Sequence, residues 1–259
     1  MMTTIGAELS SARTLFTRGT DLFGAEEIKA VFGLDVTPPP ILLSEEELRL
    51  ARKRSEMLVY QPVSITMKQI HEMRANLTSD GKLLFYNTDW YQSEAFFTND
   101  ALRPGWRLVS REVIQASRSK NYLEQADILT GELAAIYGTD MPAKIRQAIG
   151  EFEGQKKELG KLLDRDWKEA ARQLTALAVN AEFREMPAEA LWSLALYEGV
   201  NHERLLPSGN WSWTNRLSSD GFVVRVGSFA DDGARVGSGS PGNRSDSLGF
   251  RLSRGGSVK

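Results

Sequence analysis

The sequence contains no cysteine and only two histidines among its 259 residues. Without cysteine the chain can form no disulfide, no thiolate metal site and no thiol nucleophile. His71 is followed by Glu72, but Ala75 stands where a zinc protease needs a second histidine on the same helical face. His202 lies far away in the sequence. We therefore expect both histidines to be surface or capping residues, and we expect no bound metal and no cofactor.

Excess charge of one sign and long apolar runs are also missing. The formal net charge is only -2, and acidic and basic residues alternate along the chain, so no strongly electropositive surface for nucleic acid is expected. No segment approaches the ~20 apolar residues that cross a bilayer, and residues 1–16 do not resemble a secretion signal. We predict no nucleic-acid partner, no membrane insertion and, by default, a cytoplasmic location; display on a surface stays open.

What is present is the composition of a globular protein, with 41% hydrophobic residues. Three consecutive prolines, Pro38–Pro40, favour an extended joint and divide an N-terminal extension, residues 1–40, from a single domain over residues 41–259. Ser44 and Glu47 have the spacing of a capping box, which predicts a helix from there to about residue 58. A short helix over 66–77 and strands over 82–87 and 106–114 are expected next.

The region from about residue 140 to 200 has a helical pattern. Pro142 and Pro187 suit first helical turns, where a missing N–H costs nothing, and apolar residues recur at intervals of three and four between Leu159 and Ala178. Residues 189–197 are apolar nearly all round, which predicts a buried helix. We interpret these residues as core.

The composition changes after Trp213. From Thr214 to Val258 there is no Lys, Glu, Gln, His, Met or Trp, while Gly and Ser are abundant. Residues 221–229 and 248–252 keep β-branched and aromatic side chains, so an ordered, loop-rich β region is expected. In the last strand Leu248, Phe250 and Leu252 should face the core, with Gly249 and Arg251 on the opposite face, as a half-buried strand requires.

This region also contains Gly237–Gly242, which has the G-x-G-x-x-G spacing of phosphate-binding loops. A dinucleotide site needs a helix directly after the glycines and an acidic residue about twenty positions further on. Neither follows here, and Pro241 would remove one N–H from the cradle. We expect a loop tip at these glycines rather than a phosphate site.

The segments 211–229 and 234–254, closing with Gly249-Phe250-Arg251, resemble the C-terminal signature of the C-type lectin fold in its formylglycine-generating-enzyme subtype. Within that group the chain most resembles the variable proteins of diversity-generating retroelements, whose C-terminal codons are rewritten by adenine-directed mutagenesis. The residue types missing after Trp213 agree, because Lys, Glu, Gln, Met and Trp cannot arise from adenine changes in an Asn codon. Residues 58–74 and 82–97 are similar to the upstream scaffold of such proteins in small-genome bacteria.

The resemblance implies an α+β, C-type lectin-like fold with helical insertions and a loop-rich C-terminal β region, of which about residues 214–254 are variable. It also implies a non-enzymatic protein that binds an unknown protein or other macromolecule. The ligand-facing candidates are Leu217, Asp220, Phe222, Arg225, Ser228, Ala230, Asp231, Ala234, Ser238, Ser240, Asn243, Ser245 and Ser247. Phe222 and Arg225 are the expected energetic anchors, because aromatic residues and arginine dominate binding hot spots.

Two alternatives stay open at this point. One is an enzyme of the formylglycine-generating-like superfamily with an unrecognised metal site, although the copper-binding cysteines of those enzymes and the histidines of the related iron-dependent sulfoxide synthases are absent. The other is a helical scaffold whose lectin-like end is only structural. Oligomerisation, which would raise avidity, is also open.

Overall fold

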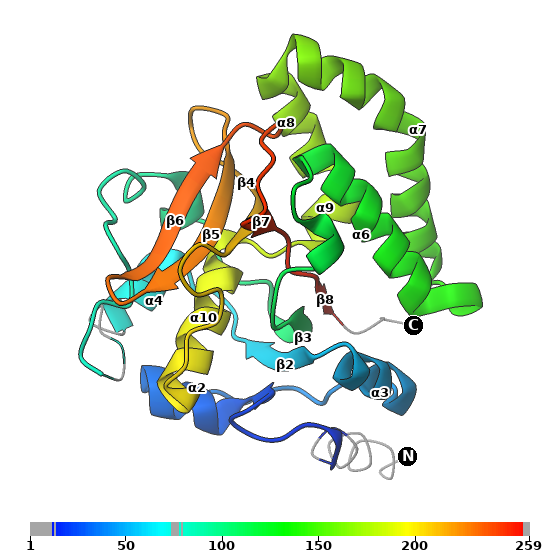
Figure 1. The fold of residues 1–259 in the computed structure, drawn as a ribbon. Coiled ribbons are helices and arrows are strands. Elements are labelled where there is room, and N and C mark those ends of the chain that lie inside the picture. Colours follow the sequence, from blue (N-terminus) through cyan, green and yellow to red (C-terminus); the bar gives the residue numbers. More distant parts are fainter. Residues whose placement is uncertain (1–11, 13, 74–77, 79, 256–259) are drawn as a thin grey trace.

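The computed structural model describes residues 12, 14–73, 78 and 80–255. Within these residues the chain forms helices and two mixed four-stranded β-sheets, so the predicted combination of α and β structure is confirmed. In Figure 1 the sheet labelled β4, β5 and β6 lies on the left and the helices labelled α6 to α9 lie on the right. The sheet that contains the strands labelled β2 and β3 lies below both.

The first sheet has the strand order β1-β2-β3-β8. Its strands are β1 (Leu22–Phe23), β2 (Glu56–Gln61), β3 (Gly105–Ser110) and β8 (Ser253–Gly255). Strand β1 is parallel to β2, whereas β2–β3 and β3–β8 are antiparallel. The pairing of β8 with β3 returns the C-terminal end of the described chain to strands from its first half.

The N-terminal segment contributes to the core. The sequence places residues 1–40 outside the domain, but β1 pairs with β2 and helix α2 (Ala25–Phe32) packs against α10 (Pro187–Asn201). Phe32 stacks on Trp192 with ring centroids 4.2 Å apart. Residues 22–32 are therefore part of the folded unit, and residues 1–11 lie outside the described range.

Helix α3 (Glu45–Lys53) begins with the predicted capping box, in which the Ser44 hydroxyl accepts the Glu47 N–H and the Glu47 carboxylate accepts the Ser44 N–H. The helix ends earlier than residue 58, because Ser55 takes a positive φ of 55° and the chain enters β2. Helices α4 (Met67–Met73) and α5 (Ala95–Thr98) follow. The predicted strand at 82–87 is wrong: Leu83 and Phe85 form isolated bridges, of which that of Phe85 is to Ala234.

The helical layer starts before the predicted residue 140. It consists of η1 (Gln115–Ser117), α6 (Tyr122–Tyr137), η2 (Gly138–Asp140), α7 (Ala143–Arg165), α8 (Trp167–Ala176) and α9 (Ala178–Phe183). The apolar stripe from Leu159 onward is divided at Asp166, which leaves helical geometry and caps α8 by accepting the Glu169 N–H. The stripe therefore packs as two helices.

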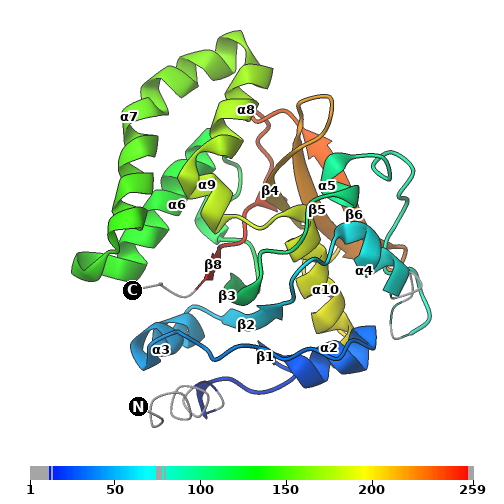
Figure 2. The same cartoon turned by 180° about the vertical axis from the view of Figure 1, so that it is seen from behind.

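Helix α10 is the predicted buried helix, with Pro187 in its first turn. It runs through the centre of the molecule, as both views show (Figures 1 and 2). Trp192 is fully buried, and its indole N–H donates to the Tyr60 carbonyl of β2 at 3.0 Å. On the other side α10 contacts β4 and β5 of the second sheet, so this helix joins the two sheets.

The second sheet has the order β6-β5-β4-β7. Its strands are β4 (Trp211–Leu217), β5 (Val223–Ala230), β6 (Gly233–Gly239) and β7 (Leu248–Gly249). Val224 and Val226 belong to the core cluster that also contains the α10 side chains. Because side chains alternate along a strand, Arg225 points to the opposite side of this sheet, away from α10.

The C-terminal segment differs from its prediction on one face. Leu248, Phe250 and Leu252 pack against the helical layer as expected, but Arg251 is also fully buried. Its guanidinium donates to the Ser110 carbonyl at 2.7 Å and to the Ser193 hydroxyl at 3.0 Å. It lies 3.2 Å from the buried carboxylate of Glu185, whose pKa is raised by burial to about 7 even beside this arginine.

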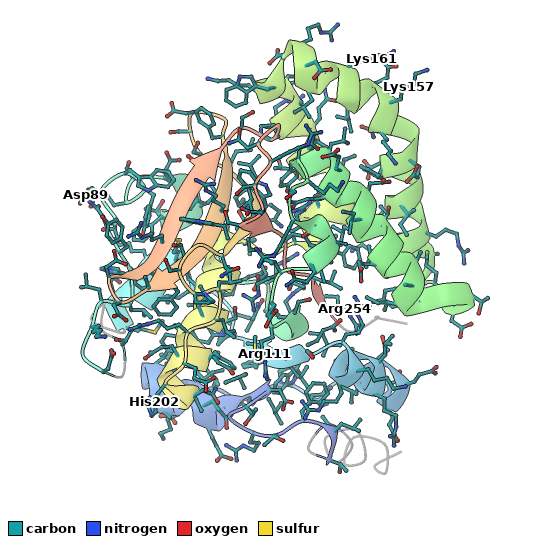
Figure 3. All side chains as sticks on the ribbon, viewed as in Figure 1. Asp89, Arg111, Lys157, Lys161, His202 and Arg254 are labelled. Carbon is teal, nitrogen blue, oxygen red and sulfur yellow. The ribbon has the colours of Figure 1, made fainter. Side chains whose placement is uncertain are left out.

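Other buried arginines are paired in the same way. Arg254 of β8 meets Glu56 of β2 at 3.0 Å, and Arg103 meets Glu189 of α10. Figure 3 shows Arg254 within the molecule, whereas Lys157 and Lys161 extend outward from α7. Charged pairs thus link β8 to β2 within the first sheet, and the segment before β3 to α10, in addition to the apolar contacts.

We expect Phe250→Ala to lower the free energy of unfolding by about 3 to 5 kcal/mol, because Phe250 is fully buried among the side chains of the helical layer. The exposed Asn243→Ala should change the free energy of unfolding by less than about 0.5 kcal/mol. Urea denaturation of both variants measures the difference. Equal losses would contradict the separation of core from surface.

We expect Arg251→Met to cost about 3 to 5 kcal/mol of stability, because it leaves Glu185 buried without its cation. The double variant Arg251→Met/Glu185→Leu should be more stable than Arg251→Met, since it removes the uncompensated charge. Chemical denaturation of the single and double variants tests this. If the two single losses simply add, Glu185 and Arg251 do not interact as described.

Candidate functional site

The ligand-facing candidates lie on and around the second sheet, but they do not form one surface. Leu217, Asp220 and Phe222 lie at the β4–β5 hairpin, and Ala230 and Asp231 lie at the other end of β5. Ser240, Asn243, Ser245 and Ser247 lie in the segment between β6 and β7. Arg225 lies on β5 between the hairpin and Ala230, on the face of the second sheet that points away from α10; we call this face the outer face.

Three candidates, Ala234, Ser228 and Ser238, do not face solvent on the outer face of the second sheet. Ala234 is 1% exposed because residues 84–86 cover it, with its N–H donating to the Leu84 carbonyl at 2.8 Å. Ser228 is 6% exposed, takes a positive φ of 44°, and its hydroxyl accepts the Gly209 N–H. Ser238 is paired opposite Val224, so its side chain lies on the α10 side of the sheet. Ser228 and Ala234 are scaffold residues, contrary to prediction.

The hairpin candidates are partly covered by helix α8. Phe222 packs on Trp167 with ring centroids 4.6 Å apart, and Leu217 packs against the core cluster of the helical layer. Asp220 is exposed. Phe222 is therefore half-buried by helix α8, which argues against the prediction that it is an exposed anchor for a ligand.

Arg225 has a defined position on the outer face of the sheet. Its guanidinium lies over the Trp211 ring, 4.7 Å from the ring centroid. The opposite neighbour across the ladder is Gly237, where a Cβ would come within 3.2 Å of the Arg225 Nε atom. Gly237 thus leaves the space in which Arg225 lies flat against the indole.

Two more residues extend this outer face. Asn243 reaches back over Gly239, where a Cβ would come 2.9 Å from the Asn243 amide nitrogen. Arg235, which the strand register places on the same side as Arg225, stacks over Tyr86 at 4.4 Å. We define the outer face by Tyr86, Trp211, Arg225, Arg235 and Asn243. Tyr86, Trp211 and Arg235 were not among the candidates; Trp211 is half-buried and also packs against the core cluster of the helical layer.

The glycine motif is only partly a loop. Gly237 and Gly239 lie within β6, and the chain turns at 240–243, where the Asn243 N–H donates to the Ser240 carbonyl. No helix follows the motif directly. The nearby N-terminus of α6 is capped by Asn121, whose side chain accepts the Glu124 N–H. Gly237 and Gly239 therefore belong to the sheet, and only the turn at residues 240–243 matches the predicted loop tip.

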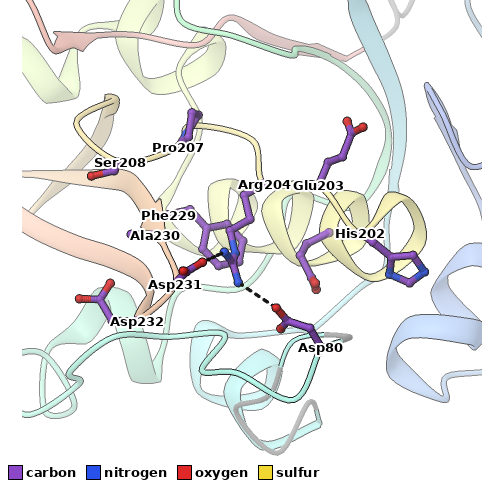
Figure 4. Close-up of a pocket in the computed structure, with 11 residues that line it drawn as sticks. Asp80, His202, Glu203, Arg204, Pro207, Ser208, Phe229, Ala230, Asp231 and Asp232 are labelled. Carbon is purple, nitrogen blue, oxygen red and sulfur yellow. Dashed lines mark hydrogen bonds and ion pairs between the residues drawn. The ribbon is translucent and has the colours of Figure 1, made fainter.

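A separate cleft of about 840 Å³ opens at the other end of β5 and β6. Figure 4 shows Arg204 in its centre, between Asp231 and Asp80, with ion-pair distances of 2.5 and 3.5 Å. The remaining lining includes Ala230, Phe229, Glu203 and His202. Asp231 is therefore already engaged by Arg204, and hydrogen bonding to that arginine lowers the pKa of Asp231.

The histidines lie apart from the outer face. His202 is the C-cap of α10, in left-handed geometry, at the lower end of that helix (Figure 3). His71 packs against Phe85 and Phe97, so it is a half-buried packing residue rather than a surface one. Within the described residues, no three His, Asp or Glu side chains are arranged to hold a metal ion.

Comparison with known proteins gives no match, whether with family models, curated proteins or solved structures. In the described part of the chain, no helix combines the length and the apolar character needed to span a bilayer.

We expect Gly237→Val to move Arg225 off the indole, because the new side chain would occupy the place of its Nε atom. The Arg225 Nε–H resonance should then lose the ring-current shift of Trp211, while the free energy of unfolding changes by less than about 1 kcal/mol. Nitrogen–proton correlation spectra provide the measurement. Gly242→Val, whose nearest contact is the Ser240 hydroxyl at 3.7 Å, is the control; an unmoved Arg225 signal in Gly237→Val would contradict this geometry.

Proposed function

We propose that this chain is a non-enzymatic binding protein, the variable protein of a diversity-generating retroelement with a C-type lectin-like fold. It presents its C-terminal β region to a macromolecular ligand. The observation that carries the proposal is the contrast within residues 211–254. Trp213, Phe250 and Arg251 are fully buried, whereas Asp220, Asn243 and Asp246 on the same segment are exposed.

This contrast suits a diversified protein because exposed loop and strand positions can change while the core stays constant. The C-terminal segment also returns to the first sheet through β8 and Arg254, so the surface is attached to the scaffold at its end. A fixed attachment of this kind keeps the variable positions in a constant framework. The structure thus supports a stable display surface.

The enzyme alternative has no supporting observation. The described residues provide no set of metal-binding side chains, and the cleft around Arg204 has this arginine paired with Asp231 and Asp80. We therefore propose binding alone.

Sequencing this gene from many individual cells of its population tests the proposal. We expect substitutions to concentrate at adenine-containing codons between residues 214 and 254, at exposed positions such as Asp220 and Asn243. Codons for the buried Trp213, Ala234 and Phe250 should stay constant because their replacement would destabilise the fold. A reverse-transcriptase gene and a near-copy of this segment should lie nearby. Variation spread evenly along the chain, with no such gene, would contradict the proposal.

A further inference from the structure

Arg225 differs from the other arginines beneath the surface because its side chain has no hydrogen-bond or ion-pair partner in the described part of the chain. Arg103, Arg251 and Arg254 each meet a buried glutamate, at positions 189, 185 and 56. Arg184 is fully buried without an ion pair, but its guanidinium donates to the side chains of Asn180 and Gln125. No hydrogen bond or ion pair joins the Arg225 side chain to another described residue, and its Nε atom is buried without an acceptor. Burial lowers the pKa of Arg225, with no nearby carboxylate to oppose that effect. Among these arginines, Arg225 is the partly desolvated cation without an internal hydrogen-bond partner.

Holding a guanidinium in this way has an energetic cost. A buried N–H without an acceptor loses its hydrogen bonds to water and gains none from the protein. Stacking on Trp211 offsets part of that cost, because the indole face attracts a cation. Unlike Nε, the terminal Nη groups of Arg225 are not enclosed by the protein and have no hydrogen-bond partner among the described residues, so an external acceptor can bind them.

The position of Arg225 is also restricted before any ligand arrives. The Trp211 ring lies against the guanidinium, and Gly237, across the ladder, lies close to both the Arg225 Nε atom and that ring. A planar fork held in this orientation matches the two oxygens of a carboxylate, and less side-chain entropy is lost on binding.

The surroundings favour a protein ligand. Tyr86 and Trp90 are 45% and 41% exposed beside β6, and the Trp90 indole N–H donates to the Val236 carbonyl at the edge of that strand. Arg235 adds a second guanidinium on the same face, although Asp232 pairs with it. Aromatic side chains around an arginine are typical of protein-binding hot spots, whereas nucleic acid needs a row of several basic residues.

We propose that Arg225 binds the carboxylate of an aspartate or glutamate side chain on a protein ligand, with Trp211 and the neighbouring aromatic residues contacting the apolar side chains around it. The inference rests on the proposed binding function and specifies the chemistry of its ligand. Arg225 is then the anchor of the outer face, and the other exposed positions adjust specificity around it.

The test uses the full chain, immobilised, and two display libraries of disulfide-constrained peptides. The libraries are identical except that the central position is Asp or Glu in one and Asn or Gln in the other. We expect binders mainly from the acidic library. Arg225→Gln should weaken those binders about tenfold or more, and amidating the peptide carboxylate should weaken them equally, with no further loss when both changes are combined.

Arg225→Lys should give an intermediate loss, since lysine keeps the charge but lacks the fork and the stack. Arg244→Gln is the matched control, because Arg244 is an exposed arginine of the same segment that pairs with Glu124. It should leave binding unchanged. Urea denaturation of each variant confirms that it remains folded.

The other outcomes separate the two levels of the proposal. Equal enrichment from both libraries, with binders lost on Trp211→Ala but kept on Arg225→Gln, overturns the carboxylate inference and leaves the binding function standing. Competition by inorganic phosphate but not by acetate also overturns the carboxylate assignment. If neither library yields a binder that Trp211→Ala or Asn243→Ala weakens, the outer face is not a binding surface and the proposed function fails.

Discussion

The buried contact between Arg251 and Glu185 is the constraint on which the C-terminal half of the structure depends. Arg251 reaches the end of β3 through the Ser110 carbonyl and α10 through the Ser193 hydroxyl, while its own N–H donates to Ser212 of β4. One residue therefore connects the first sheet and α10 through its side chain and the second sheet through its backbone. A buried charge must be paired and hydrogen-bonded to be tolerated, so these elements can pack in few other ways.

This constraint also separates the scaffold from the exposed surface. The apolar side chains of residues 248–252 pack against the helical layer, and the Arg251 guanidinium is hydrogen-bonded to α10 and β3. On the outer side of β5, Val223 is still buried against the helical layer, whereas Arg225, two residues further on, is only half-buried. Arg225 shows the difference most clearly, since it is the same residue type as Arg251 and yet has no internal counter-ion among the described residues.

Sequence reasoning succeeded where local chemistry decides the structure. The Ser44 capping box, the Pro187 helix start and the apolar residues of α10 each follow from backbone hydrogen bonding or burial of a single element. It failed where distant segments meet. Alternation placed Arg251 on the strand face opposite to the core, and only the approach of Glu185 shows why the charge can be buried. Ala234 and Ser228 were assigned to the surface because residues 84–86 and Gly209, which cover or bind them, are remote in the sequence.

The central claim is that the fold of residues 211–254 is held by buried residues and is independent of the outer face. A saturation-mutagenesis library of this segment, displayed on cells and selected for resistance to protease, tests it most directly. The account predicts that nearly all substitutions at Arg251, Phe250 and Trp213 lower protease resistance, whereas Arg225, Asp220 and Asn243 accept most residue types. Equal sensitivity at Arg225 and Arg251 would show that the outer face belongs to the scaffold and would contradict the account.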